Sequence, residues 1–326
     1  MKKKKTLSYA KYGYIFSLPF VITFCLFTLY PVVFTIIIGF TDFKGLGAKI
    51  STMHFLAEPF KNYSTILSNA TFQKALSNTF LMWGMNFAPQ ILLALVLAAW
   101  FSGMLIKVKG QGFFKVVFYM PNIITAATVA VLFGSIFGYP MGPMNDILRS
   151  WFGRSEPYEF FRNPWIARGV VAFIQFWMWY GYTMIVLISG ILGMNPEWFE
   201  AADIDGATGL QKFMYITLPN LRSILIYTLV TSLIGGLQMF DIPKLLVTQS
   251  GPDNATLTAS VFIQNQAFAG SYLYTRASAA SMILFVIICI LSAIVFYLMQ
   301  DKYEVAEKKQ LKAAAKAAKK ARKGAN

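Results

Sequence analysis

Long apolar runs alternate with short polar connections along this chain of 326 residues. A helix needs about 20 mostly apolar residues to cross the hydrocarbon core of a bilayer. Runs of this kind predict membrane-spanning helices over residues 13–40, 75–101, 113–137, 166–193, 221–247 and 279–298. The pattern therefore predicts an all-α membrane protein with six transmembrane helices.

Several of these runs contain prolines, which predict kinks. Neighbouring helices or water can satisfy the backbone carbonyls that a proline leaves without a donor, so a proline need not end a span. The prolines concerned are Pro19, Pro31, Pro89, Pro121 and Pro243. The first run is far longer than the ~7–15 apolar residues of a secretory signal, so we expect it to remain as an uncleaved first span.

The composition agrees with a membrane protein. Hydrophobic residues make up 56% of the chain and charged residues only 13%, whereas soluble domains average about 25% charged. The net charge of +15 does not indicate a nucleic-acid partner, because the basic residues lie in the connections between apolar runs. Cys25 and Cys289 lie inside apolar runs and His54 is the only histidine, so neither a disulfide nor a metal site is predicted.

The distribution of Lys and Arg predicts the orientation, since positive connections stay in the cytoplasm. With the N-terminus inside, nineteen of these residues are cytoplasmic and nine are outside. We therefore expect a basic cytoplasmic N-terminus over 1–12, a transmembrane domain over 13–300 and a basic cytoplasmic tail over 301–326, in a bacterial plasma membrane. The tail would either contact anionic lipid or remain solvated and enforce the topology.

One cytoplasmic connection, residues 200–219, reads EAADIDGATGLQKFMYITLP and predicts two short helices joined by a bend. Pro196 suits the first turn of a helix, and Glu200 is favoured near its positive end. Gly206 permits a sharp turn that residues with a Cβ resist. The second helix would end at Pro219 and present an apolar face made of Phe213, Ile216 and Leu218.

This connection resembles the EAA loop found in permease subunits of binding-protein-dependent ABC importers. The resemblance implies a type I importer fold and a loop over 194–220 that docks into a cleft on a separate ATPase subunit. The residues carried over to that coupling role are Glu200, Ala201, Ala202, Asp205, Gly206, Ile216, Leu218 and Pro219. An ordinary interfacial hairpin is the alternative interpretation of the same segment.

Two further stretches are similar to the sugar-importing, maltose-permease-like branch of that family. FDIPKLLVTQSGPDNATLT resembles a signature after the fifth span, with Ser250 where a glycine is usual and one extra residue before Thr248. FGYPMGPMNDIL resembles the external segment after the third span. The resemblance implies a second permease subunit, two ATPase subunits that bind ATP and Mg, an extracytoplasmic solute-binding protein and a sugar as cargo.

The chain itself has no ATP-binding motif. A P-loop needs Gly-Lys followed by Ser or Thr, and no Gly-Lys dipeptide occurs. We therefore expect no enzymatic activity, no catalytic residues and no cofactor in this subunit.

Polar and aromatic residues on the fourth and fifth spans predict a solute site, because polar groups are expensive where they face lipid. Aromatic rings suit the C–H faces of a sugar, while amides and carboxylates suit its hydroxyls. The predicted residues are Gln175, Trp179 and Tyr182 on one helix face, Trp177 offset from them, and Thr231, Gln238 and Asp241. Alternatively, these groups anchor the helices at the interface or join them by hydrogen bonds, or Asp241 pairs with Lys244.

The sequence leaves two other functions possible. A secondary transporter would need ionisable carriers within its spans, which offer little beyond Asp241 and Lys244, and it leaves the EAA-like loop unexplained. An ABC permease for a glycerophosphate would want an arginine in its cavity. Only Arg168, at the outer edge of the fourth run, comes near.

Overall fold

A computed structural model describes residues 10–43, 45, 47, 49–103, 108–247, 250–269 and 272–299. The tail predicted over 301–326 and most of the N-terminal segment 1–12 lie outside these residues. The described chain is helical, and its extended backbone pairs only in an isolated bridge between Thr41 and Phe55. It divides into two compact units, and the division falls within helices α4 and α15.

The first unit comprises Met1–Lys74 and Ala259–Val286. Asn62 ties its parts together by donating to the carbonyls of Gly39 and Thr41, both at 3.0 Å. Burial raises the pKa of the nearby Tyr63 hydroxyl above its usual range. The helical elements of this unit are α1 (Ala10–Phe24), a π turn (Cys25–Leu29), α2 (Tyr30–Gly39), a 3₁₀ turn (Ile50–Thr52), α3 (Lys61–Leu67), α14 (Ala259–Phe268), and the beginnings of α4 (Ala70–Phe101) and α15 (Tyr274–Met299).

The second unit, Ala75–Thr258 with Ile287–Asn326, contains most of the predicted spans. It holds the remainder of α4 and α15, the long helix α8 (Pro164–Leu192), and α12 (Arg222–Leu237). Its shorter elements are α5 (Gln111–Ile123), α6 (Ala126–Ile136), α7 (Pro143–Phe152), a 3₁₀ turn (Phe160–Arg162), α9 (Pro196–Ile204), α10 (Gly209–Lys212), a π turn (Phe213–Thr217), α11 (Leu218–Asn220), α13 (Asp241–Leu246) and a 3₁₀ turn (Pro252–Asn254).

Five stretches of the described chain are long and apolar enough to cross a membrane. They are Tyr12–Gly39, Ala70–Phe101, Pro164–Leu192, Arg222–Leu246 and Tyr274–Met299, each within a few residues of a predicted span. A sixth span exists only if the bent pair α5 and α6 counts as one. These helices make the chain a multi-pass membrane protein.

The prediction of one kinked helix over 113–137 is wrong. Helices α5 and α6 meet at 90°, with the break after Ile123 rather than at Pro121. The reason is a new helix start: Thr125 is extended, and its hydroxyl accepts the backbone N–H of Thr128 as an N-cap. Asn122 holds the bend against α8 by donating to the carbonyl of Met178 at 3.1 Å.

The fifth predicted span is also interrupted, between α12 and α13. The kink expected at Pro243 is instead a break over residues 238–240, three residues earlier. Thr258 satisfies one freed carbonyl there by donating to Met239 at 2.9 Å. Non-helical backbone at membrane depth is tolerated where protein buries it or where it lines a water-filled cavity.

Helices α5 and α8 pack with their backbones in close contact. A Cβ on Gly181 of α8 would overlap the carbonyl oxygen of Phe118 and stand 2.9 Å from the Cα of Tyr119. Small residues allow this approach, which is how membrane helices gain packing contacts without a hydrophobic driving force. One apolar core of the unit, which includes Tyr180 and Met184, lies beside this contact.

Candidate functional site

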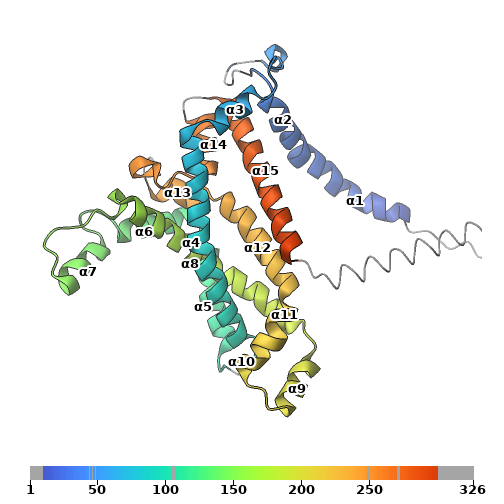
Figure 1. Ribbon diagram of the computed structural model, residues 1–326, viewed down its shortest axis with the longest axis vertical. Helices are drawn as coiled ribbons and strands as arrows, with labels where there is room; N and C mark the ends of the chain where they lie inside the picture. Colours follow the sequence, from blue (N-terminus) through green and yellow to red (C-terminus); the bar gives the residue numbers. More distant parts are fainter. Residues whose placement is uncertain are drawn as a thin grey trace, which may run out of the picture. The chain divides into compact units, whose positions relative to one another are not determined.

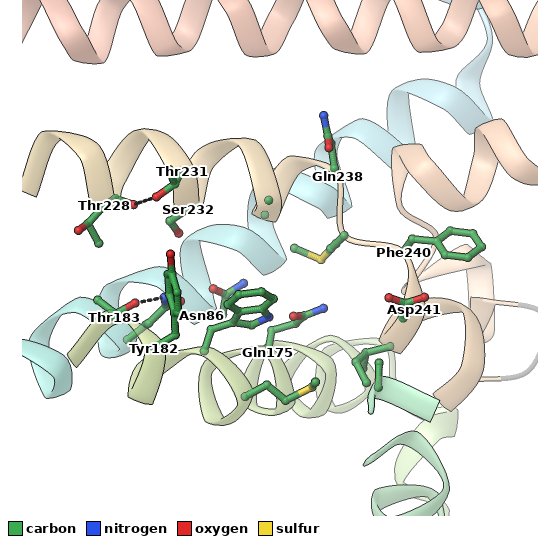
Figure 2. A pocket seen from close by; sticks show the side chains of 18 of the residues that line it. Asn86, Gln175, Tyr182, Thr183, Thr228, Thr231, Ser232, Gln238, Phe240 and Asp241 are labelled. Atoms are coloured by element: carbon green, nitrogen blue, oxygen red, sulfur yellow. Dashed lines mark hydrogen bonds between the residues drawn. The ribbon is translucent and has the colours of Figure 1, made fainter. Parts of the chain in front are cut away.

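The second unit encloses a cavity of about 430 Å³ that is lined from several helices. Its lining comes from α4, α6, α8, α12, the break over 238–240 and α13 (Figure 2). The interrupted fifth span thus borders the cavity, as expected for irregular backbone in a membrane. A volume of this size falls within the range of small-molecule sites.

The walls of the cavity combine aromatic rings with polar groups. Trp179 and Tyr182 meet edge to face, with ring centroids 6.0 Å apart and planes at 84°. In Figure 2 the Tyr182 side chain extends from α8 toward Ser232 on α12. Among the described residues that line the cavity, Asp241, the first residue of α13, is the only charged one. Rings beside amides, hydroxyls and one carboxylate suit a polar, uncharged solute.

Six of the seven predicted solute residues line this one cavity: Gln175, Trp179, Tyr182, Thr231, Gln238 and Asp241. The amide of Gln238 points away from Gln175 in Figure 2. Trp177 is not in the lining; its ring packs edge to face on Phe133, 5.6 Å between centroids. It belongs to the packing of α8 against α6.

Sequence reasoning missed the contribution of α4. Asn86 and Gln90, both buried, reach the cavity from that helix. Gln90 donates to the hydroxyl of Thr183 at 2.8 Å and so joins α4 to α8 at the cavity wall. The signal was present as two amides one helical turn apart in an apolar run, where polar groups face the protein interior.

At the end of α8, helices α9 and α10 form a bent segment, here called the elbow (196–220; Figure 1). Pro196 lies in the first turn of α9, and Asn195 caps that helix by accepting the N–H of Glu197. Gly206 ends it with φ +74°. The N–H groups of Gly206 and Ala207 bond the carbonyls of Asp203 (3.1 Å) and Ala202 (2.9 Å), the pair of bonds that defines a Schellman motif.

The second half of the elbow does not stop at Pro219, contrary to expectation. A capping box between Thr208 and Gln211 starts α10, which continues through the π turn into α11 with Pro219 in its first turn. A π turn is wider than an α turn, so it relieves the clash between a proline ring and the preceding carbonyl. The side chain of Asn220 donates to the carbonyl of Ile216 at 2.7 Å, in the same turn as Pro219.

The elbow has a buried base and an exposed tip. Phe199 and Leu221 are buried in the apolar core that also contains Ile191, at the end of α8. Glu200, Ala201, Asp205 and Gly206 are exposed, whereas Ala202 is buried. Ile216 and Leu218 are half-buried and Pro219 is exposed. Apolar side chains also protrude from the tip: Ile204 is 87% exposed and Leu210 72%.

Residues 86–304, two thirds of the chain and both features just described, match the family of binding-protein-dependent transport system inner membrane components. The chain belongs to this family. Membership as a permease subunit confirms the identification made from the elbow sequence, and it removes the secondary transporter from consideration.

Individual permeases resemble the chain over nearly their whole length. It is 27% identical over 291 residues to the lactose transport system permease protein LacF of Rhizobium radiobacter, covering 89% of this chain and 94% of the relative. It is 30% identical over 277 residues to the arabinooligosaccharides transport system permease protein AraP of Bacillus subtilis (strain 168), covering 85% of each.

Among solved structures, a chain of the bacterial alginate ABC transporter, in complex with an alginate pentasaccharide-bound periplasmic protein, has the same fold. The TM-score is 0.72 at 24% identity, over 89% of this chain and 94% of that chain. A second structure of an alginate importer gives a TM-score of 0.70 at the same identity.

In this permease, Arg168 does not line the cavity. Its guanidinium donates twice to the Asn78 side chain, at 3.2 and 3.0 Å, and once to the carbonyl of Ala255 at 3.0 Å. Asn78 in turn donates to the carbonyls of Asn254 and Leu257. Arg168 thereby fixes the loop after α13 against α4 and α8.

That loop contains the departure from the sugar-branch signature. Ser250 has φ +63°, in the left-handed region that favours glycine. Ser250 therefore has a backbone conformation that glycine adopts more readily than serine.

Proposed function

We propose that this chain is one of two permease subunits of an ABC importer that carries a sugar or short oligosaccharide across the plasma membrane. Both termini face the cytoplasm, as the Lys and Arg distribution predicts. The permease relatives named for lactose and arabinooligosaccharides support a saccharide as the cargo class.

The observation that carries the proposal is the convergence of six predicted solute residues on one cavity beside a broken helix. They come from α8, α12, the 238–240 break and α13, so their meeting is not a consequence of local spacing. The carboxylate of Asp241 favours a solute that donates hydroxyl hydrogens over a phosphate, because two like charges in a partly desolvated site repel. The sugar is therefore favoured over the glycerophosphate.

The elbow supports the proposal for coupling. Its exposed, partly apolar tip suits a groove on a cytoplasmic ATPase subunit, and two such subunits bind ATP and Mg. The buried Phe199 and Leu221 connect the tip to α8 and α12, the two helices that supply most of the cavity wall. ATP binding changes the state of the cavity only if ATP has different affinities for the inward-facing and outward-facing states.

The remaining partners are a second permease subunit, an extracytoplasmic solute-binding protein that delivers the sugar, and membrane lipid. The alginate transporter was solved with its periplasmic protein bound, which supports such a delivery step by analogy.

Uptake by intact cells tests this function. Cells with and without the gene are given labelled lactose, arabinotriose and N,N′-diacetylchitobiose, and each strain is treated with either an uncoupler or an ATP-depleting agent. We expect one or more of these sugars to accumulate only with the gene, to survive the uncoupler and to stop when ATP is depleted. Accumulation that the uncoupler abolishes while ATP remains would contradict the proposal.

Replacing Trp179 tests the cavity. Trp179 is 45% exposed, so a solute can cover part of it. Burying an aromatic face against a sugar contributes roughly 1.5–3 kcal/mol, so Trp179→Ala should raise the apparent KM for uptake at least ~10-fold. Gln238→Ala should raise it less, because its amide points away from Gln175. Trp100→Ala, outside the lining, is the control, and an unchanged KM for Trp179→Ala would contradict the site.

A further inference from the structure

The elbow contains a buried lysine that sequence reasoning did not single out. Lys212, the last residue of α10, has a side chain only 8% exposed, although the elbow as a whole protrudes from the unit. Its ammonium Nζ lies 2.7 Å from Oδ1 of Asp203 on α9. The side chain of Asp203 is 61% exposed, so its carboxylate remains partly solvated while it pairs with the buried Lys212. Loss of the carboxylate would leave the ammonium without its anionic partner, which is disfavoured for a buried charge.

This ion pair differs in kind from the other bonds of the elbow. The Schellman bonds at Gly206 close the end of α9, and the capping box of Thr208 opens α10. Each acts within the backbone turn or at one helix terminus, and none joins a side chain of α9 to a side chain of α10. The Lys212–Asp203 pair joins the two helices across the bend, nine residues apart in sequence.

The position of the Lys212–Asp203 pair affects how motion at the tip of the elbow reaches α12. Helix α9 is anchored through the buried Phe199, and α10 continues through the π turn and α11 to the buried Leu221 before α12. A push on the exposed tip can therefore either bend the elbow or move α12. Movement of α12 reaches the cavity, since Thr231 and Gly235 lie on that helix.

We propose that the Lys212–Asp203 ion pair is a positioning element that fixes the angle between α9 and α10, so that motion at the tip moves α12 instead of bending the elbow. The angle is a property of this chain alone. The consequence for transport rests on the proposed coupling of the elbow to an ATPase subunit.

The angle is measured by pulsed electron resonance on the full chain in its assembled complex, in lipid nanodiscs. Spin labels go on Trp198→Cys and Tyr215→Cys, which are 46% and 80% exposed, with Cys25 and Cys289 replaced by serine. We expect a narrow distance distribution in the parent protein, a broad one with Lys212→Met or Asp203→Asn, and a narrow one with the conservative Asp203→Glu. Distributions for Lys212→Met and the parent that superimpose would overturn the inference.

Transport is measured in the same variants without labels, as uptake of the panel sugar that the parent strain accumulates. We expect each single variant to reduce uptake about 10-fold, and the double variant to be no worse than either single, because partners in one pair are not additive. Glu197→Gln removes an exposed charge from the same helix and should leave uptake unchanged. The amounts of membrane protein and retained ATPase subunit are compared, so that lost assembly is not counted as lost coupling.

Including Glu200→Lys separates this inference from the proposed function. If Glu200→Lys stops uptake but Lys212→Met does not, the positioning role is refuted and the coupling loop stands. If neither variant changes uptake, the proposed coupling through the elbow fails together with the positioning role, whereas gene-dependent uptake by the parent strain tests the importer function separately.

Discussion

Gly206→Pro is expected to reduce uptake at least ~100-fold while the permease still inserts into the membrane. Gly206 has φ +74°, whereas proline fixes φ near −65°. Its N–H also donates to the carbonyl of Asp203 at 3.1 Å, and proline has no N–H to replace it. The Schellman motif therefore cannot form, α9 and α10 lose their bend, and the exposed tip no longer fits a partner.

A graded series at this position separates backbone conformation from steric contact. A Cβ on Gly206 would meet no atom of the described residues within 4 Å, so side-chain size alone should matter little. Asparagine adopts the left-handed region readily and should retain uptake, whereas alanine loses roughly 1 kcal/mol of local stability and should be intermediate. Uptake, membrane protein and retention of the ATPase subunit in a pull-down are measured together. Normal uptake and retention with Gly206→Pro would refute the coupling role of the elbow.

Gly181→Val should have the largest effect on the amount of folded permease. The added Cβ would overlap the Phe118 carbonyl oxygen and press on the Cα of Tyr119, and neither backbone atom can rotate away. Helix α5 would have to separate from α8, which disrupts the core containing Tyr180 and Met184. Overpacking of this kind typically costs 1–3 kcal/mol and more where backbone must move, so we expect at least a ~10-fold loss of full-length protein from the membrane.

Gly169→Ala is the matched control for this prediction. Gly169 lies on the same helix, and a Cβ there would meet nothing within 4 Å in the part of the chain that the structure describes. Alanine is also the better helix former, so protein amounts should be equal to or above the parent. Quantitative immunoblotting and size-exclusion chromatography in mild detergent provide the measurement. Equal, monodisperse yields for Gly181→Val and Gly169→Ala would show that the close approach of α5 and α8 is not required.

Part of the cavity lining could be predicted from the sequence. Gln175, Trp179 and Tyr182 could be placed together because their spacing of four and three residues puts them on one face of a single helix. Their meeting with Asp241 depends on the break at 238–240, which Pro243 did not locate. The contribution of Asn86 and Gln90 to the cavity was not predicted, because the sequence did not show which face of α4 turns inward.

The sequence by itself determined the apolar stretches, the all-helical class and the bend at Gly206, because apolar length, helix caps and the conformational freedom of glycine are local properties. Tertiary structure alone decided the right angle after Ile123, the passage of the helix through Pro219, and the burial of Lys212 beside Asp203. In each of these the local chain permits more than one conformation. Contacts with residues far along the chain, such as Asn122 with Met178, select among them.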